Sequence, residues 1–251
     1  MYENILITAI SQKFVKSCMT MIHSVHKYSM DTVEQIYVYN LGLSPNKKLL
    51  LNKFERVTVV DIDPSVNNIF PGYLNPSNYA FKIYCLWDAK KYGKNVFWLD
   101  SGALFLKNCK EIYDFIKNDD FFCVQDRDPN TNRKLTHKKA QEIMNATNEE
   151  LDSVQLCAGI IGYKVGGKYN KLIDEAFHYS CIQDCICGSK EDHRHDQSIL
   201  SILTYRYHCP RHDMNKYGEI YNFVESCRSN NVVIYVHRNS IHMYDGIKIK
   251  K

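Results

Sequence analysis

The sequence predicts an α/β fold in which a mixed, mostly parallel β-sheet lies between layers of helices. The main observation is that short apolar runs of strand length alternate four times with segments whose apolar residues recur at helical spacing. The length of 251 residues suits one domain, and 45% hydrophobic with 24% charged residues is an ordinary globular composition. We expect a ligand site beyond the carboxyl ends of the strands.

The first half of the chain supplies four strands and the helices between them. In chain order we expect a strand at 4–9, a helix with apolar residues at 14, 18, 22 and 25, a strand at 35–39, a helix from 45, a strand at 57–60, a helix at 80–91 and a strand at 95–99. Ser44 supplies an N-cap for the second helix, and Pro45 takes its first position. Residues 92–94, Tyr-Gly-Lys, are expected to end the next helix as a glycine stop.

The second half of the chain is less regular. We expect strands at 121–124, 156–163 and 232–236 and helices at 169–179 and 197–205. The polar stretch at 126–139 has no apolar periodicity, and we interpret it as a mobile loop. The sequence contains no internal repeat and no low-complexity segment, so we expect residues 1–251 to form a single domain.

The charge and the cysteines limit the class of protein. A formal net charge of +4, from 32 basic and 28 acidic residues, is too balanced for a protein that binds duplex nucleic acid. The first residues show no secretion signal and no membrane anchor, and ten cysteines in such a chain indicate reduced thiols. We therefore expect a cytoplasmic protein without a membrane span. A homodimer is compatible with the sequence.

The sharpest chemical feature is the segment 96–102, Val-Phe-Trp-Leu-Asp-Ser-Gly. An apolar strand here delivers one carboxylate, Asp100, to the ligand-bearing edge of the sheet, and small residues follow it. An aspartate after a strand is also a common turn former, which is the structural alternative. The features that accompany Asp100 favour a functional role.

The order of elements resembles the GT-A fold of glycosyltransferases, a Rossmann-like nucleotide-binding fold in which an Asp-x-Asp motif follows the fourth strand. The motif here reads Asp100, Ser101, Gly102. The resemblance covers nearly the entire chain and is nearest to small single-domain transferases akin to the glycogenin and galactosyltransferase group. It implies a nucleotide-binding half at 1–102 and a sugar and acceptor half at 103–251.

Shorter segments carry the same resemblance. Residues 6–10 resemble the first strand of the family, whose exit contacts the nucleoside, and residues 79–82 resemble its basic helix before the acidic motif. Residues 157–162 resemble the small-residue segment that admits the sugar, and residues 193–198 resemble the acidic helix start that faces it. Besides the motif, the resemblance implies donor-binding roles for Thr8, Ala9, Ile10, Lys82, Gly159, Asp196 and Gln197.

The resemblance also implies a divalent metal, Mn²⁺ or Mg²⁺, bound by Asp100 at the donor diphosphate, where hard oxygen ligands suit such ions. The usual second acid of the motif is replaced by Gly102, so one expected ligand is missing. His237, just after the last strand, is the first candidate for a metal-binding histidine. His242 is the alternate, because His242 and Lys248 keep the histidine-to-lysine spacing of the family, with Lys248 then binding the donor.

Two further residues have roles that the sequence leaves open. Asp196 opens a helix, where its carboxylate caps free amide groups, a role worth about 1 kcal/mol. In the functional interpretation, Asp196 contacts the donor sugar or, in an inverting enzyme, takes a proton from the acceptor hydroxyl. Tyr39, at the end of the second strand, is expected to stack on the uracil ring of the donor.

A group of cysteines and histidines raises the alternative of a structural zinc site. The group consists of Cys181, Cys185, Cys187, His193 and His195. Its spacing is not one of the common finger or ribbon patterns, so buried or incidental cysteines are the favoured interpretation.

The sequence and the resemblance therefore predict a hexosyl or N-acetylhexosaminyl transferase that uses a nucleoside diphosphate sugar, a UDP-sugar in the first place, and a glycan or protein acceptor. Asp100 and Asp196 are the predicted catalytic residues. A catalytically silent glycan or nucleotide-sugar binder is the alternative from another class, because of Gly102. A sugar nucleotidyltransferase is disfavoured, since its glycine-rich basic loop should lie at 9–14, where no glycine occurs.

Overall fold

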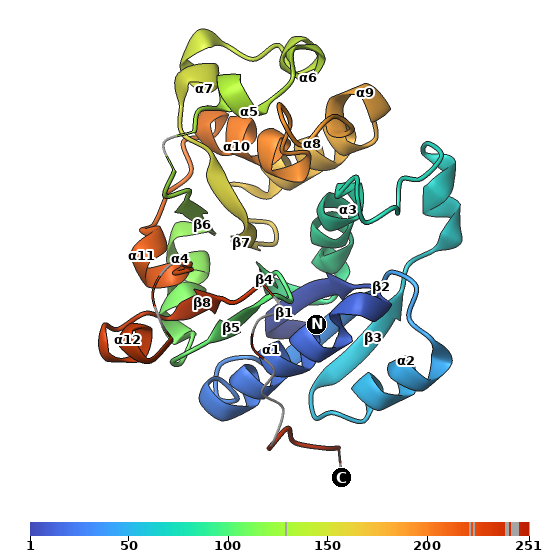
Figure 1. Ribbon diagram of the computed structural model, residues 1–251, viewed down its shortest axis with the longest axis vertical. Helices are drawn as coiled ribbons and strands as arrows, with labels where there is room; N and C mark the ends of the chain where they lie inside the picture. The colour runs from blue at the N-terminus through green and yellow to red at the C-terminus, as the bar shows by residue number, and fades with distance from the viewer. Residues whose placement is uncertain (129, 221, 223, 239–240, 242–245, 251) are drawn as a thin grey trace.

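The structure is a computed structural model that describes residues 1–128, 130–220, 222, 224–238, 241 and 246–250. Its centre is a six-stranded sheet in the order β3-β2-β1-β4-β7-β6 (Figure 1). In chain order the strands are β1 (Tyr2–Ile10), β2 (Gln35–Asn40), β3 (Val57–Asp61), β4 (Gly93–Leu99), β6 (Phe121–Gln125) and β7 (Leu156–Lys164). The predicted strands of the first half are thus neighbours in one sheet.

The sheet is mixed and mostly parallel, as predicted. Strands β1 to β4 pair in parallel, whereas β7 lies antiparallel between β4 and β6. Because β7 runs in the opposite direction, it begins at the edge where β4 ends, and Leu99 pairs with Ile160 there. The start of β7 therefore lies beside Asp100, at the carboxyl edge of the parallel strands.

Helices cover both faces of the sheet, and each face has its own apolar core. Along β1, Ile5 and Ile7 belong to one core and Leu6 to the other, as the alternation of side chains in a strand requires. The helices on the Ile5 face are α3 (Ala80–Asp88), α8 (Asn170–Ser180) and α10 (Asp196–Arg206). Those on the Leu6 face are α1 (Val15–Tyr28), α2 (Pro45–Asn52) and α4 (Lys110–Asp119).

A second, two-stranded sheet joins the C-terminal segment to the residues after Asp100. Strands β5 (Ala103–Phe105) and β8 (Ile234–Val236) pair antiparallel, with Ala103 opposite Val236. The shorter elements are η1 (Gln12–Phe14), η2 (Pro64–Asn68), η3 (Ala89–Lys91), α5 (Asn132–Leu135), α6 (Lys138–Ile143), α7 (Asn148–Asp152), α9 (Gln183–Ile186), α11 (Met214–Tyr217) and α12 (Val224–Ser229). In the part of the chain that the structure describes, no helix is long and apolar enough to cross a membrane.

The expected glycine stop at 92–94 is wrong. Gly93 is the first residue of β4 rather than a helix cap. Its lack of a side chain serves strand packing, because a Cβ atom at this position would lie 2.6 Å from Cγ2 of Ile5 on the neighbouring strand. The helix itself ends at Asp88 and continues as the 3₁₀ turn η3.

The expected loop at 126–139 is wrong in part. Apart from residue 129, the stretch contains α5 and the beginning of α6. Asn132 is fully buried there, and its side-chain amide donates a hydrogen bond of 2.9 Å to the carbonyl oxygen of Glu150. The segment is thus anchored by a buried polar side chain. Because its apolar residues do not recur at helical spacing, the sequence pattern did not predict these helices.

Candidate functional site

Three charged side chains meet at the carboxyl edge of the sheet. Nζ of Lys82 lies 2.9 Å from Oδ2 of Asp196 and 3.2 Å from Oδ1 of Asp100. The side chains of Lys82 and Asp196 are each 5% exposed, whereas that of Asp100 is 49% exposed. The ammonium group therefore joins a buried acid to an acid that faces solvent.

Each member of this cluster comes from a different element. Asp100 directly follows β4, Lys82 lies in the first turn of α3, and Asp196 is the first residue of α10. The carboxylate of Asp100 also accepts a hydrogen bond of 2.7 Å from Nε1 of Trp98, and its backbone N–H donates to the carbonyl oxygen of Gly159 at 2.9 Å. Both the backbone and the side chain of Asp100 are thus held in place.

Burial and charge act in opposite directions on the two buried groups. Burial alone would lower the pKa of Lys82, but the nearby charges of Asp100 and Asp196 outweigh it and raise that pKa above its usual value. Burial raises the pKa of Asp196, and the charge of Lys82 offsets this only in part. The ammonium group of Lys82 thus pairs with two carboxylates. Within the buried ion pair, the charged form of Lys82 is favoured and that of Asp196 is disfavoured relative to water.

Gly159 leaves room for the carboxylate of Asp100. A Cβ atom at position 159 would lie 2.9 Å from Oδ2 of Asp100, closer than real Cβ contacts, and 3.2 Å from its Cγ, which is also tight. The absence of a side chain on β7 therefore determines how closely Asp100 can approach this strand. That Gly159 also contacts the donor stays a prediction.

The end of β1 lies at the same edge as Asp100. Ile7 pairs with Trp98, so Thr8, Ala9 and Ile10 continue beside the end of β4. Thr8 and Ile10 are buried and Ala9 is half-buried, so a nucleoside at this edge would meet mainly the Ala9 side. Their predicted contact with the donor stays a prediction.

His237 lies next to the acidic motif. Its backbone N–H donates a hydrogen bond of 2.8 Å to the carbonyl oxygen of Gly102, and the N–H of Arg238 donates to the same oxygen at 3.0 Å. Ser101, between Asp100 and Gly102, is buried. The pairing of β5 with β8 therefore brings the first-choice histidine to the motif, whereas the alternate at position 242 lies outside the described residues.

Two predicted donor-binding residues are not at this site. Tyr39 is fully buried, and its hydroxyl donates a hydrogen bond of 2.9 Å to Asp88 between β2 and α3, so its ring is closed off from a uracil. The backbone N–H of Lys248 donates to Nδ1 of His26, and its carbonyl oxygen accepts from the N–H of Glu55. Glu55 precedes β3, so Lys248 lies at the opposite, amino edge of the sheet.

Two residues near the site, Gln155 and Asp126, were not predicted from the sequence. Gln197 donates a hydrogen bond of 2.8 Å to the side chain of Gln155, and the carbonyl oxygen of Gln155 accepts from the N–H of Asp126 at 2.9 Å. Burial raises the pKa of Asp126. Burial also raises the pKa of Cys157 to about 12, and the charge of Asp100 adds to this effect. The position of Asp126 at the end of β6, an edge shared with Asp100, was the signal that could have identified it.

The residues present could bind a divalent metal only together with the phosphates of a nucleotide-sugar donor. Among the described residues, no group of three or more His, Cys, Asp and Glu side chains could hold a metal ion. Asp100 and His237 alone are too few for an ion held entirely by protein. The half-exposed carboxylate of Asp100 does fit Mg²⁺ or Mn²⁺ bound through one carboxylate and substrate phosphates, which is a common arrangement for Mg²⁺. The described cysteines and histidines between 181 and 195 likewise form no such group.

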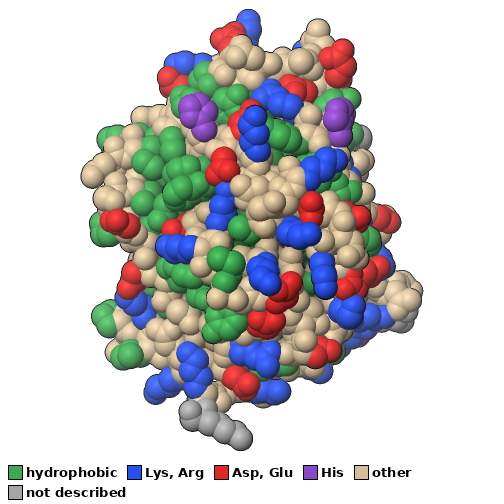
Figure 2. All heavy atoms as spheres, turned by 180° about the vertical axis from the view of Figure 1, so that it is seen from behind, with side chains coloured by type: hydrophobic (Ala, Val, Ile, Leu, Met, Phe, Trp, Pro, Cys, Tyr) green, Lys and Arg blue, Asp and Glu red, His purple; other side chains and the backbone are tan. Residues whose placement is uncertain are grey.

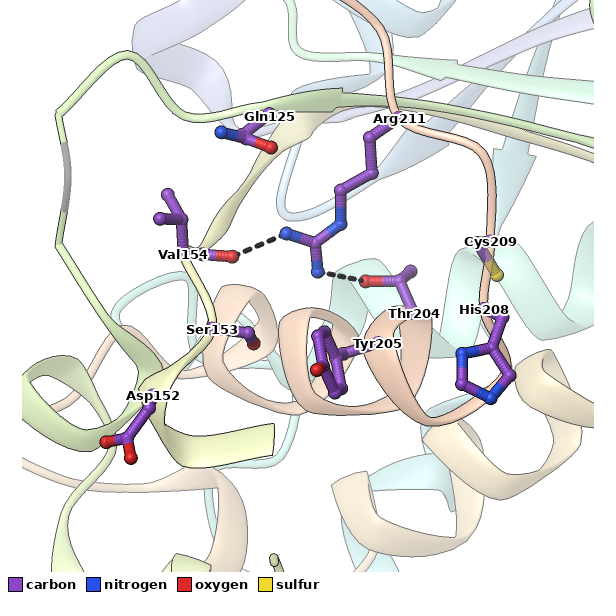
Figure 3. A pocket seen from close by; sticks show the side chains of 9 residues that line it. All are labelled: Gln125, Asp152, Ser153, Val154, Thr204, Tyr205, His208, Cys209 and Arg211. Atoms are coloured by element: carbon purple, nitrogen blue, oxygen red, sulfur yellow. Dashed lines mark hydrogen bonds between the residues drawn. The ribbon is translucent and has the colours of Figure 1, made fainter. Parts of the chain in front are cut away.

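A cavity of about 580 Å³ lies away from this cluster, between α10, the segment before β7 and the segment after α10 (Figure 3). Arg211 crosses the cavity, and its guanidinium donates a hydrogen bond of 2.6 Å to the carbonyl oxygen of Val154. It also contacts Oγ1 of Thr204 at 3.4 Å. The arginine joins two elements across the cavity, and no predicted site residue lines it.

The back of the molecule carries charges of both signs. Figure 2 shows lysine and arginine side chains interspersed with aspartate and glutamate on this face, together with small apolar areas. The visible face therefore presents no extended region of a single charge.

The sheet order, the reversed strand β7 and the acidic turn after β4 define the GT-A fold of glycosyltransferases, and the chain has this fold. No protein-family model matches the sequence, and comparison with curated proteins finds no match either. The similarity to known proteins is therefore a similarity of structure.

Three solved structures illustrate this similarity. The apo structure of WbbM, a bifunctional glycosyltransferase, has a TM-score of 0.65 at 12% identity over 99% of this chain, which spans 46% of that longer protein. The galactosyltransferase LgtC, in complex with donor and acceptor sugar analogues, has a TM-score of 0.60 at 13% identity, over 94% of this chain and 87% of LgtC. Mouse xyloside xylosyltransferase 1 in its apo form has a TM-score of 0.59 at 10% identity, over 96% and 99% of the two chains. At such identities the likeness concerns the fold, and function must be argued from the site.

Proposed function

We propose that this protein is a glycosyltransferase that moves a hexose or N-acetylhexosamine from a UDP-sugar to a glycan or protein acceptor. The observation that carries the proposal is the ammonium group of Lys82 between Asp100 and Asp196, at the edge where α/β sheets bind ligands. The cluster joins the two halves of the chain, because Lys82 and Asp100 precede residue 103 and Asp196 follows it. Residues 1–102 would bind the nucleotide, and residues 103–251 the sugar and acceptor.

The reaction needs a group that stabilises negative charge. When the anomeric C–O bond breaks, its electron pair stays with the departing UDP, and the acceptor oxygen forms the new bond to the anomeric carbon. Lys82 supplies a positive charge for this diphosphate, and the raised pKa of Lys82 keeps it protonated at neutral pH. The acceptor hydroxyl loses its proton to a base, for which Asp196 is the candidate if the enzyme inverts.

Asp100, on the solvent side of Lys82, is the proposed contact to the diphosphate through a divalent ion. With His237 it would hold this ion, which would supply Lewis-acid stabilisation of the leaving group. The half-exposed carboxylate of Asp100 supports this role, because a donor can reach it without opening the fold. Gly159 and Gln197 are the proposed neighbours of the transferred sugar.

The experiment that tests the proposal measures the release of UDP. The protein is incubated with a panel of UDP-hexoses and UDP-N-acetylhexosamines and with Mn²⁺, with and without simple glycan acceptors. We expect slow release of UDP from at least one donor even without an acceptor, because water can replace the acceptor hydroxyl. Failure to bind or hydrolyse any nucleotide sugar would count against the proposal.

A second candidate function is that of a catalytically silent binder of nucleotide sugars. Gly102 favours it, because the motif has a single acid where the family usually has two. Binding of UDP-sugars in a calorimeter without release of UDP under the same conditions would select this alternative.

A further inference from the structure

The helix starts that carry Lys82 and Asp196 are in contact through two rings. Tyr79 precedes α3 and His195 precedes α10, and their rings stack with centroids 5.5 Å apart and an angle of 25° between their planes. Lys82 follows Tyr79 by three residues, and Asp196 follows His195 directly. The stacked rings therefore lie beside the ion pair of Lys82 and Asp196, on which the proposed function is based.

Both ring-bearing residues have strained backbones. Tyr79 adopts the left-handed conformation, with φ 56° and ψ 2°. His195 has φ 50° and ψ −117°, a combination that L-residues rarely adopt. Glycine would adopt either conformation without this strain, yet each position has a ring. Strained residues that persist at a site are held there by their surroundings, and such strain is often connected with function.

These two residues set the direction of the helices behind them. The carbonyl oxygen of Tyr79 accepts a hydrogen bond of 3.0 Å from the N–H of Lys82, and that of His195 accepts one of 3.1 Å from the N–H of Ser198. A change in the backbone at either N-cap therefore moves the first turn of its helix, and with it the Lys82 or Asp196 side chain.

His195 is in turn held from its other side. Its Nδ1 lies 2.9 Å from the carbonyl oxygen of Ile186, the last residue of α9. The ring of His193 meets it edge-on with centroids 5.3 Å apart, and the ring of His137 lies 4.1 Å from that of His193. His193 and His195 are buried, so this chain of rings is a fixed support rather than a surface contact.

We propose that Tyr79 and His195 are positioning residues, whose stacked rings hold two strained helix starts together so that Lys82 and Asp196 stay paired beside the proposed donor site. We call the stacked pair of Tyr79 and His195 the clamp. The ammonium group of Lys82 lies 5.9 Å from the centre of the Tyr79 ring, so this cation also contacts the clamp. The catalytic consequence of this clamp rests on the proposed glycosyl transfer, whereas its geometric consequence does not.

The test removes the ring while keeping the backbone conformation accessible. Tyr79→Gly and Tyr79→Asn both allow a positive φ without a phenol ring, and Tyr79→Phe restores the stack. His208→Gly is the matched control, because His208 also has a positive φ of 52° but is exposed and lies beyond the C-terminal end of α10. UDP release and thermal unfolding are measured for each variant, and crystal structures are solved of the wild type, Tyr79→Gly and Tyr79→Phe.

We expect Tyr79→Gly and Tyr79→Asn to fold but to lose turnover by about tenfold to a hundredfold, because small displacements of catalytic groups have effects of this size. The distance between Nζ of Lys82 and Oδ2 of Asp196 should grow from 2.9 Å to beyond about 4 Å in Tyr79→Gly and stay short in Tyr79→Phe. Turnover should be retained in Tyr79→Phe and His208→Gly.

Two outcomes would overturn the positioning role. One is a Tyr79→Gly variant that keeps the short ion pair and full turnover, and the other is unfolding of both ring-less variants, which would make the ring a general element of the core. A wild-type protein that releases no UDP would end the proposed function instead, and the ion-pair distances in the crystals would still decide the positioning role.

Discussion

The carboxylate of Asp100 occupies the space where a side chain at Gly159 would have to be. A Cβ atom built on Gly159 would lie 2.9 Å from Oδ2 of Asp100, while the carbonyl oxygen of Gly159 accepts the backbone N–H of Asp100. Two neighbouring antiparallel strands thus meet at one acid and one glycine. The position of the proposed donor ligand therefore depends on a missing side chain on β7.

Gly159→Ala should impair activity by displacing Asp100. We expect turnover to fall at least about tenfold and the unfolding free energy to drop by about 1–3 kcal/mol from the steric clash. Gly167→Ala is the matched control, because a Cβ there would meet Asp120 at the same closest distance of 2.9 Å. Comparable losses of activity in the two variants would show that the Gly159 effect is one of stability alone.

Asp100→Asn should remove activity and leave the fold intact. We expect turnover to fall by at least about a hundredfold, because the carboxylate is the proposed ligand of the divalent ion at the diphosphate. The unfolding free energy should change by less than about 1 kcal/mol, since the side chain is 49% exposed. Asp114→Asn, at a side chain that is 48% exposed and paired with Lys110, is the control. Full activity of Asp100→Asn would show that Asp100 is not part of the active site.

Lys82→Met should destabilise the protein at neutral pH, because it leaves the buried carboxylate of Asp196 without its cation. The expected loss is about 3–5 kcal/mol in denaturant unfolding, and the double variant with Asp196→Asn should recover part of it. A double variant no more stable than Lys82→Met would contradict the buried pair.

The pH dependence of Lys82→Met follows from the same pair. Burial already raises the folded-state pKa of Asp196, and loss of Lys82 raises it further. A raised carboxyl pKa stabilises the fold at low pH and loses that contribution as the pH rises through the folded value. The deficit of Lys82→Met against the wild type should therefore shrink as the pH falls through the carboxyl range, which unfolding curves at several pH values would measure.

His193 should make the fold sensitive to acid. Burial, followed by the neighbouring His137 and His195, lowers its pKa from 6.5 to about 3. Below pH 6.5 the unfolded chain binds a proton that the folded state does not, so this residue lowers stability by up to about 1.4 kcal/mol per pH unit down to about pH 3. His193→Gln should show a smaller stability loss between pH 7 and pH 4 than the wild type. His178→Gln, at an exposed histidine, should follow the wild-type curve, and identical curves for all three would contradict the prediction.

Much of the fold could be predicted from the sequence, because it depends on local patterns. The apolar runs predict the strands of the large sheet, and Pro45 marks the start of α2. The position of Asp100 followed from the same logic, since an acid after a buried strand emerges at the strand's carboxyl end. Its neighbours Lys82 and Asp196 are 18 and 96 residues away along the chain, and only the resemblance to a known fold placed them together.

The failures concern burial and the path of the chain. Tyr39 ends a strand and so was expected to be open, but α3 covers it and Asp88 binds its hydroxyl. The spacing that favoured Lys248 could not indicate that the C-terminal residues lie beside His26. The strained conformations of Tyr79 and His195 could not be predicted either, because they depend on contacts between distant helices rather than on local propensity.

A crystal structure of the protein soaked with UDP and Mn²⁺ tests the central claim most directly, because it locates the diphosphate. We predict that the diphosphate lies beside Asp100 and within reach of Lys82, with the uridine along the ends of β1 and β4. UDP bound elsewhere, for example in the cavity crossed by Arg211, or an Asp100 edge that stays empty at saturating UDP, would contradict it.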